Sequence, residues 1–161
     1  MGLRLHGQLT RVRPATEEDA DLLVALHADP EVARYWDDKT YTREEILARL
    51  GRDDVDAFIV EADGEPVGYI QAWREDDAPL RGGVDMFLVP HARGRGLGPD
   101  AARVLAGHLR RDRGWTRVTV DPYTWNEPAI PAWRRAGFVV IDRRPPDDEH
   151  TAEWLLMVWE G

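Results

Sequence analysis

The sequence predicts a mixed α/β fold with one central sheet flanked by helices. Three observations lead to this prediction. Apolar runs typical of strands recur along the chain, amphipathic helical segments lie between them, and 43% of the 161 residues are hydrophobic. No internal repeat or low-complexity linker divides the chain, and this length suits one domain with a substantial core. We therefore expect a single α/β domain over residues 1–161.

Two helices are expected in the first part of the chain, after a short strand over residues 9–13. Thr16 and Asp19 have the spacing of a capping box, and the apolar stripe that follows predicts a helix ending before Pro30. Thr42 and Glu45 repeat the same spacing and predict a second helix, for which Gly51 is a stop signal. A short amphipathic segment at 31–36 separates the two helices.

The remaining elements form most of the predicted sheet. Asp63 and Gly64 lie between two apolar runs, which is typical of a β-hairpin turn. Downstream, apolar periodicity predicts further strands at 81–90, 116–122, 138–142 and 151–159, with helices at 100–113 and 126–137. The order along the chain is strand, two helices, three strands, helix, strand, helix and two strands.

Composition and charge exclude several classes of protein. The net charge is −9 and Lys39 is the only lysine, so the chain is a poor candidate for binding nucleic acid. An acidic surface favours a cationic substrate, although net charge also serves solubility alone. The chain has no cysteine, so it has no disulfide or thiolate metal site. Because no apolar run approaches the ~20 residues that span a bilayer and no signal peptide is recognisable, we expect a cytoplasmic protein that does not bind membranes.

A glycine-rich segment, RGRGLG at residues 93–98, follows a predicted strand and opens a predicted helix. Its spacing is not that of the dinucleotide-binding fingerprint, and it lacks the Lys-Ser/Thr ending of a P-loop. A glycine turn at a helix N-terminus offers unpaired N–H groups to an anion such as phosphate, and Arg93 and Arg95 add positive charge. The alternative is a tight turn that needs glycine for its backbone conformation alone.

The segment resembles the R/Q-x-x-G-x-G/A signature of the GCN5-related N-acetyltransferases (GNAT). GEPVGYIQAW at 64–73 and NEPAIPAWRRAGF at 126–138 resemble two further segments of that family, in the same order. The resemblance implies a sheet of about six to seven strands, splayed between the fourth and fifth, and acetyl-coenzyme A as cofactor. It implies that the coenzyme contacts Leu88, Val89, Arg93, Gly94, Arg95, Gly96, Leu97, Gly98, Asn126 and Trp133.

Within the family, two features are similar to the aminoglycoside 6′-N-acetyltransferases. These are Val84-Asp85 before the glycine segment and the Asp121-Pro122 pair followed by Asn126. The resemblance implies acetylation of the 6′-amine of an aminoglycoside, and hence antibiotic resistance. Alternatives are acylation of a siderophore precursor of the hydroxylysine type or of a protein N-terminus, and a module that binds acyl-CoA without catalysis.

The chemistry of N-acetylation requires a carboxylate near the acceptor, because an ammonium group must lose a proton before it attacks a thioester. Asp85 alternates with two apolar neighbours on a strand, so it can face a cleft while they face the core. Asp121 ends the neighbouring strand. We expect Asp85 to be the base or ammonium anchor and Asp121 to contact substrate; each could instead cap a strand end.

Aromatic and acidic side chains are expected to line the acceptor site, because indole rings pack against sugar faces and bind cations. Core packing is the alternative for each aromatic ring. Trp115, Trp154 and Trp159 are assigned to the core or to a subunit interface, in a monomer or homodimer, and the five histidines to structural roles. The expected substrate contacts, besides Asp85 and Asp121, are Trp36, Asp37, Asp38, Tyr69, Trp73 and Tyr123.

The chain departs from the family pattern at Trp133, where relatives commonly have a tyrosine that protonates the leaving thiolate. An indole N–H cannot serve as an acid, so water or Tyr123 would have to replace it, unless the thiolate leaves unprotonated. Pro99 removes one donor from the glycine turn. Pro131 predicts a late or distorted start to the helix after Asn126, which we expect to be its N-cap.

Overall fold

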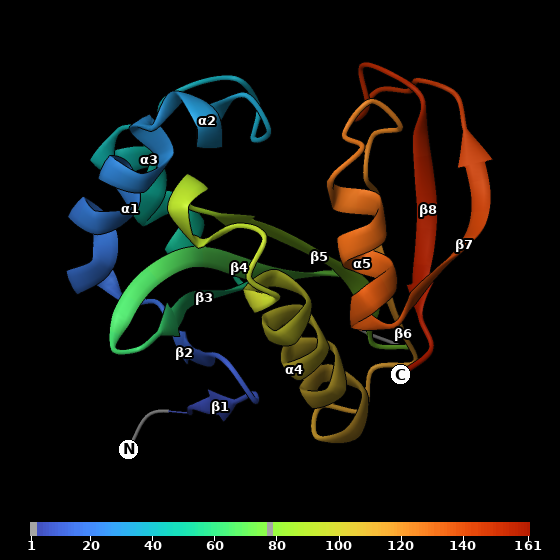
Figure 1. Ribbon diagram of the computed structural model, residues 1–161, viewed down its shortest axis with the longest axis horizontal. Helices are drawn as coiled ribbons and strands as arrows, with labels where there is room; N and C mark the ends of the chain where they lie inside the picture. The colour runs from blue at the N-terminus through green and yellow to red at the C-terminus, as the bar shows by residue number, and fades with distance from the viewer. Residues whose placement is uncertain (1–2, 77–78) are drawn as a thin grey trace.

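Figure 1 shows the computed structural model, which describes residues 3–76 and 79–161. The predicted mixed α/β architecture with a helix-flanked central sheet is confirmed. Within the described residues the sheet has eight strands, in the order β1-β2-β3-β4-β5-β6-β8-β7. Their bounds are β1 Leu5–His6, β2 Arg11–Pro14, β3 Val55–Ala62, β4 Glu65–Asp76, β5 Arg81–Leu88, β6 Arg117–Val120, β7 Phe138–Arg144 and β8 Trp154–Trp159.

Two groups of helices cover the sheet (Figure 1). The first group packs on one face around a core that includes Leu23, Ile59, Tyr69 and Phe87. The second group covers the other face over a larger core that contains Trp115 and Trp159. The first group consists of η1 Glu17–Asp19, α1 Ala20–Ala28, α2 Pro30–Ala33 and α3 Arg43–Leu50; the second consists of α4 Leu97–Arg111 and α5 Ala129–Ala136, with the short η2 Pro90–Ala92 before α4.

The sheet opens between β5 and β6, as expected for the fourth and fifth predicted strands. These parallel strands pair only where they begin, from Arg81 to Gly83 against Arg117 to Thr119. β5 then continues to Leu88 paired with β4 alone, while β6 turns to pair with β8. Within residues 3–76 and 79–161, no strand therefore lies beside the second half of β5 on its β6 side, which leaves one edge of its backbone open.

The residues that the structure describes contain eight strands, one more than the upper end of the six to seven expected. The additional strand is β1, whose two residues pair antiparallel with β2 through the tight turn at residues 7–10. Two paired residues are too short a run for side-chain alternation to predict a strand.

The helices α4 and α5 begin where their early prolines are tolerated. α4 begins at Leu97 and α5 at Ala129, so Pro99 and Pro131 are each the third helical residue. The N–H of a residue in the first turn has no partner within the helix, so proline there removes no helical hydrogen bond. The late start predicted for α5 is confirmed. The expectation that Asn126 is the N-cap is wrong, because Pro128 holds that position.

Candidate active site

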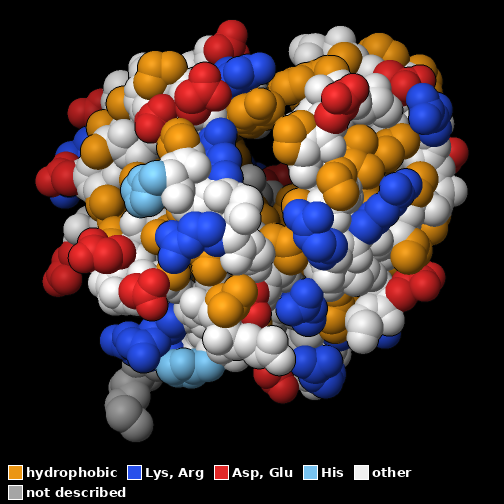
Figure 2. Space-filling view, in the orientation of Figure 1, with side chains coloured by type: hydrophobic (Ala, Val, Ile, Leu, Met, Phe, Trp, Pro, Cys, Tyr) orange, Lys and Arg blue, Asp and Glu red, His pale blue; other side chains and the backbone are white. Residues whose placement is uncertain are grey.

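An open cleft of about 740 Å³ lies where the sheet splays apart. Figure 2 shows the molecule hollowed between its two halves at this place. One wall comes from α3 and the loop that precedes it, and the floor comes mainly from β4 and β5. The other wall comes from the segment after β6, from α5 and from the loop before β8. Of the expected site residues, the cleft is lined by Trp36, Asp37, Asp85, Asp121, Tyr123, Asn126 and Trp133.

Asp85 lies on β5 just beyond its last pairing with β6. Its neighbour Val84 belongs to the larger core, so the alternation of the strand turns Asp85 to the face with Tyr69 and Phe87. Across the sheet, Gln71 Nε2 donates a hydrogen bond of 3.0 Å to Asp85 Oδ2. The Tyr69 hydroxyl donates to Gln71 Oε1 at 2.7 Å and so fixes which end of the amide faces Asp85.

Burial, and after it the negative charge of Asp121, raises the pKa of Asp85 to about 7 against the opposing hydrogen bond from Gln71. A carboxylate with a pKa near neutrality can accept a proton at physiological pH and release it again. Asp85 therefore has the protonation behaviour of a general base.

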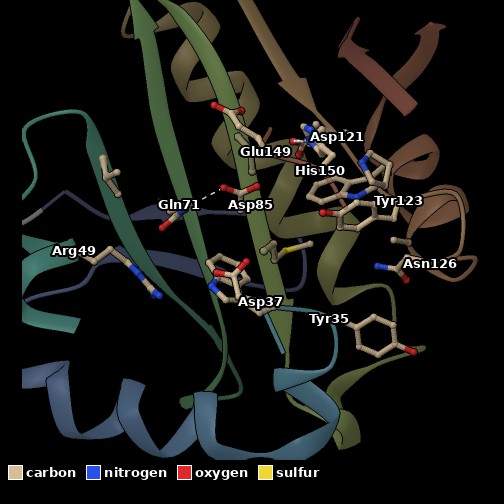
Figure 3. Close-up of a pocket in the computed structure, with 18 of the residues that line it drawn as sticks. Tyr35, Asp37, Arg49, Gln71, Asp85, Asp121, Tyr123, Asn126, Glu149 and His150 are labelled. Atoms are coloured by element: carbon tan, nitrogen blue, oxygen red, sulfur yellow. Dashed lines mark hydrogen bonds and ion pairs between the residues drawn. The ribbon is translucent and has the colours of Figure 1, made fainter. Parts of the chain in front are cut away.

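Asp121 follows β6 and faces Asp85 across the cleft (Figure 3). His150 Nε2 lies 2.6 Å from Asp121 Oδ2, and His150 Nδ1 lies 2.8 Å from Asp147 Oδ1. Burial opposes the charging of His150, but the hydrogen bonds to the two carboxylates outweigh it and raise its pKa. The ring also stacks on Trp154 at 3.9 Å between centroids. The loop before β8 is thus attached to the cleft wall through the imidazole of His150, which lies between two carboxylates.

Carboxylates outnumber cationic groups around the cleft. Besides Asp85 and Asp121, the lining includes Asp37, Glu45 and Glu149, against Arg49, Arg52 and His150. Four of these charges are engaged locally, since Glu45 pairs with Lys39, Arg52 with Asp54 and His150 with Asp121. The arrangement favours a ligand that carries more than one positive charge.

Two sets of aromatic rings border the cleft. Trp125 stacks between Tyr35, from the α2 side, and Tyr123, from the segment after β6, at 5.9 and 5.4 Å between centroids. Trp36 belongs to a second cluster with Tyr69 and Phe87 on the α3 side.

Three of the expected acceptor contacts are not part of the lining. Tyr69 is fully buried beneath Gln71, the Trp73 ring packs over Gly83, and Asp38 is exposed outside the cleft. Alternation along β4 predicts the face of the sheet on which Tyr69 lies. It does not predict that the side chain of Gln71 covers Tyr69.

The glycine segment has the geometry of an anion cradle. Gly94 and Gly96 have positive φ of 74° and 79°, and a Cβ at Gly94 would have no neighbour within 4 Å. The turn leads into the N-terminus of α4, whose first N–H groups have no partner in the helix. Leu97 and Gly98 are buried beneath this turn. The space and the donors fit a pyrophosphate group, with Pro99 contributing no donor.

Of the two arginines of the segment, Arg93 lies differently from expectation. Arg93 turns away from the cradle, since its Nε donates to Leu88 O at 3.1 Å and its Nη2 to Glu31 O at 2.8 Å. It therefore joins the end of β5 to α2. Arg95 remains exposed beside the cradle, 3.6 Å from Asp63.

The end of β5 offers only part of the expected backbone contact. Val89 N–H already donates to Val67 O at 2.9 Å, on the β4 side of the strand. Val89 therefore cannot donate to a ligand in the opening, which corrects that expectation. Leu88 lies at the unpaired side, with its carbonyl accepting from Arg93.

Several polar lining residues were not identified from the sequence as site residues, among them Arg49, Gln71, Glu149 and His150. Gln71 was accessible to sequence reasoning, because it alternates on the same strand as Tyr69. His150 and Glu149 lie in a polar loop without periodicity, and their position depends on how β7 and β8 return to the cleft.

Comparisons with known proteins agree with this geometry. The family model of the acetyltransferase (GNAT) domain matches residues 10–139. An aminoglycoside N(6′)-acetyltransferase type 1 of Klebsiella pneumoniae is 32% identical over 100 residues, which are 55% of this chain and 50% of that protein. The chain thus matches about half the length of this relative. A spermidine N(1)-acetyltransferase of Escherichia coli K12 is 28% identical over 142 residues, covering 81% of this chain and 73% of the relative.

Solved structures with the same fold include the aminoglycoside acetyltransferase AAC(6′)-Ib in complex with coenzyme A and kanamycin. It aligns with a TM-score of 0.80 at 25% identity, covering 92% of this chain and 93% of the other. A spermidine N-acetyltransferase of Vibrio cholerae, in complex with CoA and spermine, aligns with a TM-score of 0.80 at 12% identity over 93% of this chain and 94% of the other.

Proposed function

The chain belongs to the GNAT acetyltransferase family, and on this premise we propose that it transfers the acetyl group of acetyl-CoA to a primary amine of a cationic small molecule. The acceptor we propose is the 6′-amine of an aminoglycoside. The observation that carries this proposal is the position of Asp85, a carboxylate of raised pKa, at the point where β5 leaves β6 inside an acidic cleft.

The coenzyme would be held at two places in this chain. The N–H groups at the start of α4 and the turn at Gly94 and Gly96 suit its pyrophosphate, with Arg95 close by. The unpaired side of β5 at Leu88 suits its extended amide arm, because an open strand edge accepts such a ligand. Asn126 and Trp133 lie farther along the same cleft. When bound, acetyl-CoA supplies an activated carbonyl to the acceptor amine.

The acceptor would be bound and deprotonated by carboxylates. Asp121 and Glu149 line the cleft around Asp85 and would hold the ammonium groups of the acceptor. Asp85 would take the proton from the reacting ammonium, directly or through one water, and so produce the neutral amine that attacks the thioester. Trp133 can donate a hydrogen bond to the departing sulfur but cannot protonate it, so the thiolate leaves without a protein acid at that position.

A second candidate acceptor is a linear polyamine. The match to a spermidine acetyltransferase extends over more of this chain than the match to the aminoglycoside enzyme. Polyamines share the primary amine and the multiple positive charges that the cleft favours, so the two acceptors differ in shape and charge spacing rather than in chemistry.

A thiol-release assay with a panel of amines tests the proposal. We expect release of coenzyme A with kanamycin, and no release with an otherwise similar aminoglycoside that has a 6′-hydroxyl. Spermidine, a hydroxylysine and an N-terminal peptide complete the panel. Release with spermidine alone would favour the second candidate, and coenzyme binding without release for any amine would indicate a non-catalytic module.

Antibiotic resistance is the physiological consequence that we propose for this reaction. Acetylation removes a positive charge and a hydrogen-bond donor from the drug. Expression of the chain in a susceptible bacterium should raise the inhibitory concentration of kanamycin, and the Asp85→Asn variant should abolish the increase.

A further inference from the structure

One end of the cleft contains a box of aromatic rings that already holds a cation of the protein. The guanidinium carbon of Arg49 lies 5.4 Å from the ring centroid of Trp36, 4.9 Å from that of Tyr41 and 5.2 Å from that of Tyr69. All three distances are within the range of a cation–π interaction. Arg49, Trp36 and Tyr41 line the cleft, whereas Tyr69 forms the buried wall of the box.

A buried histidine completes the box. Arg49 Nη1 lies 2.9 Å from His27 Nε2. Because guanidinium only donates, Nε2 accepts and the imidazole proton is on Nδ1. His27 is fully buried and contacts the rings of Trp36 and Tyr41 at 5.6 and 4.5 Å. A neutral histidine and three rings thus surround the guanidinium of Arg49.

Arg49 occupies the space between the rings, and its charge disfavours another cation in that space. Asp37, at the edge of the cleft, accepts a 2.6 Å hydrogen bond from the Tyr41 hydroxyl. Without Arg49, the three rings and this carboxylate would be a suitable site for the ammonium group of a ligand. With Arg49 in place, an ammonium group entering the same space meets a like charge, and Lys39 Nζ already lies 4.5 Å from the centroid of the Tyr41 ring.

We propose that Arg49 is a built-in cation that closes the aromatic end of the acceptor cleft and thereby selects the acceptor. The substrate cations are then confined to the carboxylates of Asp85, Asp121 and Glu149. A compact aminoglycoside, whose amines are clustered on rigid rings, can satisfy this arrangement. An extended linear polyamine, which needs cation sites along a line, loses the one at the box.

This inference rests on the proposed acetyl transfer for its choice of substrate, but the occupancy of the box can be measured without it. Arg49→Ala should leave a cavity that binds methylguanidinium, so isothermal titration calorimetry should show saturable binding about 10-fold tighter than to the unmodified chain. Arg49→Lys keeps a cation beside the rings and should show no such gain. Equal methylguanidinium binding by Arg49→Ala and the unmodified chain would overturn the proposal.

The acceptor preference provides the second measurement. We expect the ratio of kcat/KM for spermidine to that for kanamycin to rise about 10-fold in Arg49→Ala and to remain unchanged in Arg49→Lys. Should the chain acetylate neither amine, the ratio of their dissociation constants, measured by calorimetry, replaces the kinetic ratio. An unchanged ratio in Arg49→Ala would show that Arg49 does not select the acceptor.

Two controls separate selection from misfolding and from a general effect of charge. Arg43→Ala removes a cation from the same helix, but Arg43 pairs with Asp21 on the exposed side and lines no part of the cleft. It should leave both measurements unchanged. Arg49→Met keeps the length of the side chain without its charge. If Arg49→Ala fails to fold, Arg49→Met should still raise the spermidine ratio, and failure to do so would contradict the proposal.

Discussion

Gln71 donates a hydrogen bond to the carboxylate of Asp85 across two antiparallel strands, and its own amide is oriented by the hydroxyl of Tyr69. The chain of three side chains runs from the buried face of the sheet to the cleft. The neutral amide of Gln71 donates to one oxygen of Asp85. This hydrogen bond stabilises the carboxylate and leaves it able to accept a proton. Gln71 is therefore a positioning residue for the proposed base.

Asp85→Asn removes the proposed base while retaining the shape of the side chain. We expect kcat/KM for the acceptor to fall by at least about 10²-fold, because an amide cannot accept the ammonium proton. The thiol-release assay measures the change. Asp142→Asn is a matched control, since Asp142 is exposed on β7 and pairs with Arg144 away from the cleft; it should keep its rate within about twofold.

Asp85→Asn should also stabilise the fold at alkaline pH. The pKa of Asp85 is raised to about 7 in the folded chain, above the ordinary value of about 4 in the unfolded chain. Between those values the folded state binds more protons, so stability falls as pH rises through this window. Asp85→Asn should therefore raise Tm by a few degrees, about 2–4 °C, at pH 8 and change it little at pH 4.

The pH dependence of kcat/KM should reveal the interaction between the carboxylates of Asp85 and Asp121. Because the base must be deprotonated, kcat/KM should fall as pH drops below about 7. Asp121→Asn removes a negative charge that raises the pKa of Asp85, so this acid limb should move to lower pH by on the order of one unit. The plateau should fall as well, since Asp121 is a proposed substrate contact. An acid limb that does not move would show that Asp121 does not affect the pKa of Asp85.

Gln71→Ala should move the acid limb of the pH profile in the direction opposite to that of Asp121→Asn. Its hydrogen bond lowers the pKa of Asp85, so without it the acid limb should shift to higher pH and kcat should fall about 10-fold. Tyr69→Phe leaves the amide in place without its orienting partner and should give a smaller shift of the same sign. A loss of rate with an unchanged pH profile would indicate that Gln71 acts only through packing.

Asp100 anchors the N-terminal turn to the start of α4. Its buried carboxylate accepts hydrogen bonds from the N–H groups of Gln8, Leu9 and Thr10 and from the Thr10 hydroxyl. Asp100→Ala leaves these donors without a partner and should lower the free energy of unfolding by about 3 kcal/mol in urea titrations. Amide exchange should accelerate selectively at residues 8–10.

A substitution at Gly7 tests the contact between the N-terminal turn and Asp100 from the side of the turn. A Cβ at Gly7 would lie 2.1 Å from Asp100 Oδ2 and 2.8 Å from Val104 Cγ2. Gly7→Ala should therefore destabilise the fold by about 2 kcal/mol. At Gly51 the nearest atoms would lie at 3.5 and 3.7 Å, so Gly51→Ala, the matched control, should be close to neutral. Similar unfolding curves for the two variants would contradict the tight contact.

Replacement of Pro131 tests whether this residue lies in the interior of α5 or in its first turn. An interior proline costs roughly 3 kcal/mol, whereas one in the first turn removes no helical hydrogen bond. Because α5 begins at Ala129, Pro131→Ala should change the free energy of unfolding by less than about 1 kcal/mol. A gain near 3 kcal/mol would place Pro131 in a strained interior position.

Local chemistry was enough to predict many elements from the sequence. The capping box of Thr42 and Glu45 starts α3 as expected. Asp63 and Gly64 both adopt positive φ at the hairpin turn, and residues 94–98 form a turn into a helix. Each of these signals depends on hydrogen bonds or backbone conformations within a few residues, so the sequence contains all the groups involved.

The cleft depends on contacts between residues far apart in the chain. Alternation along β5 predicts that Asp85 leaves the core, and the end of β6 predicts a second carboxylate nearby. Neither predicts that His150 reaches Asp121, that Arg93 turns toward Glu31, or that Val89 N–H is already paired.

The sequence by itself therefore determined the family, the glycine cradle and the two central carboxylates, because those signals are local and ordered along the chain. Only the tertiary structure decided which side chains share the cleft. It buried Tyr69 beneath Gln71 and filled the aromatic box with Arg49. The physical reason is that periodicity specifies the face on which a side chain lies, whereas its partner is chosen by packing between elements that are distant in sequence.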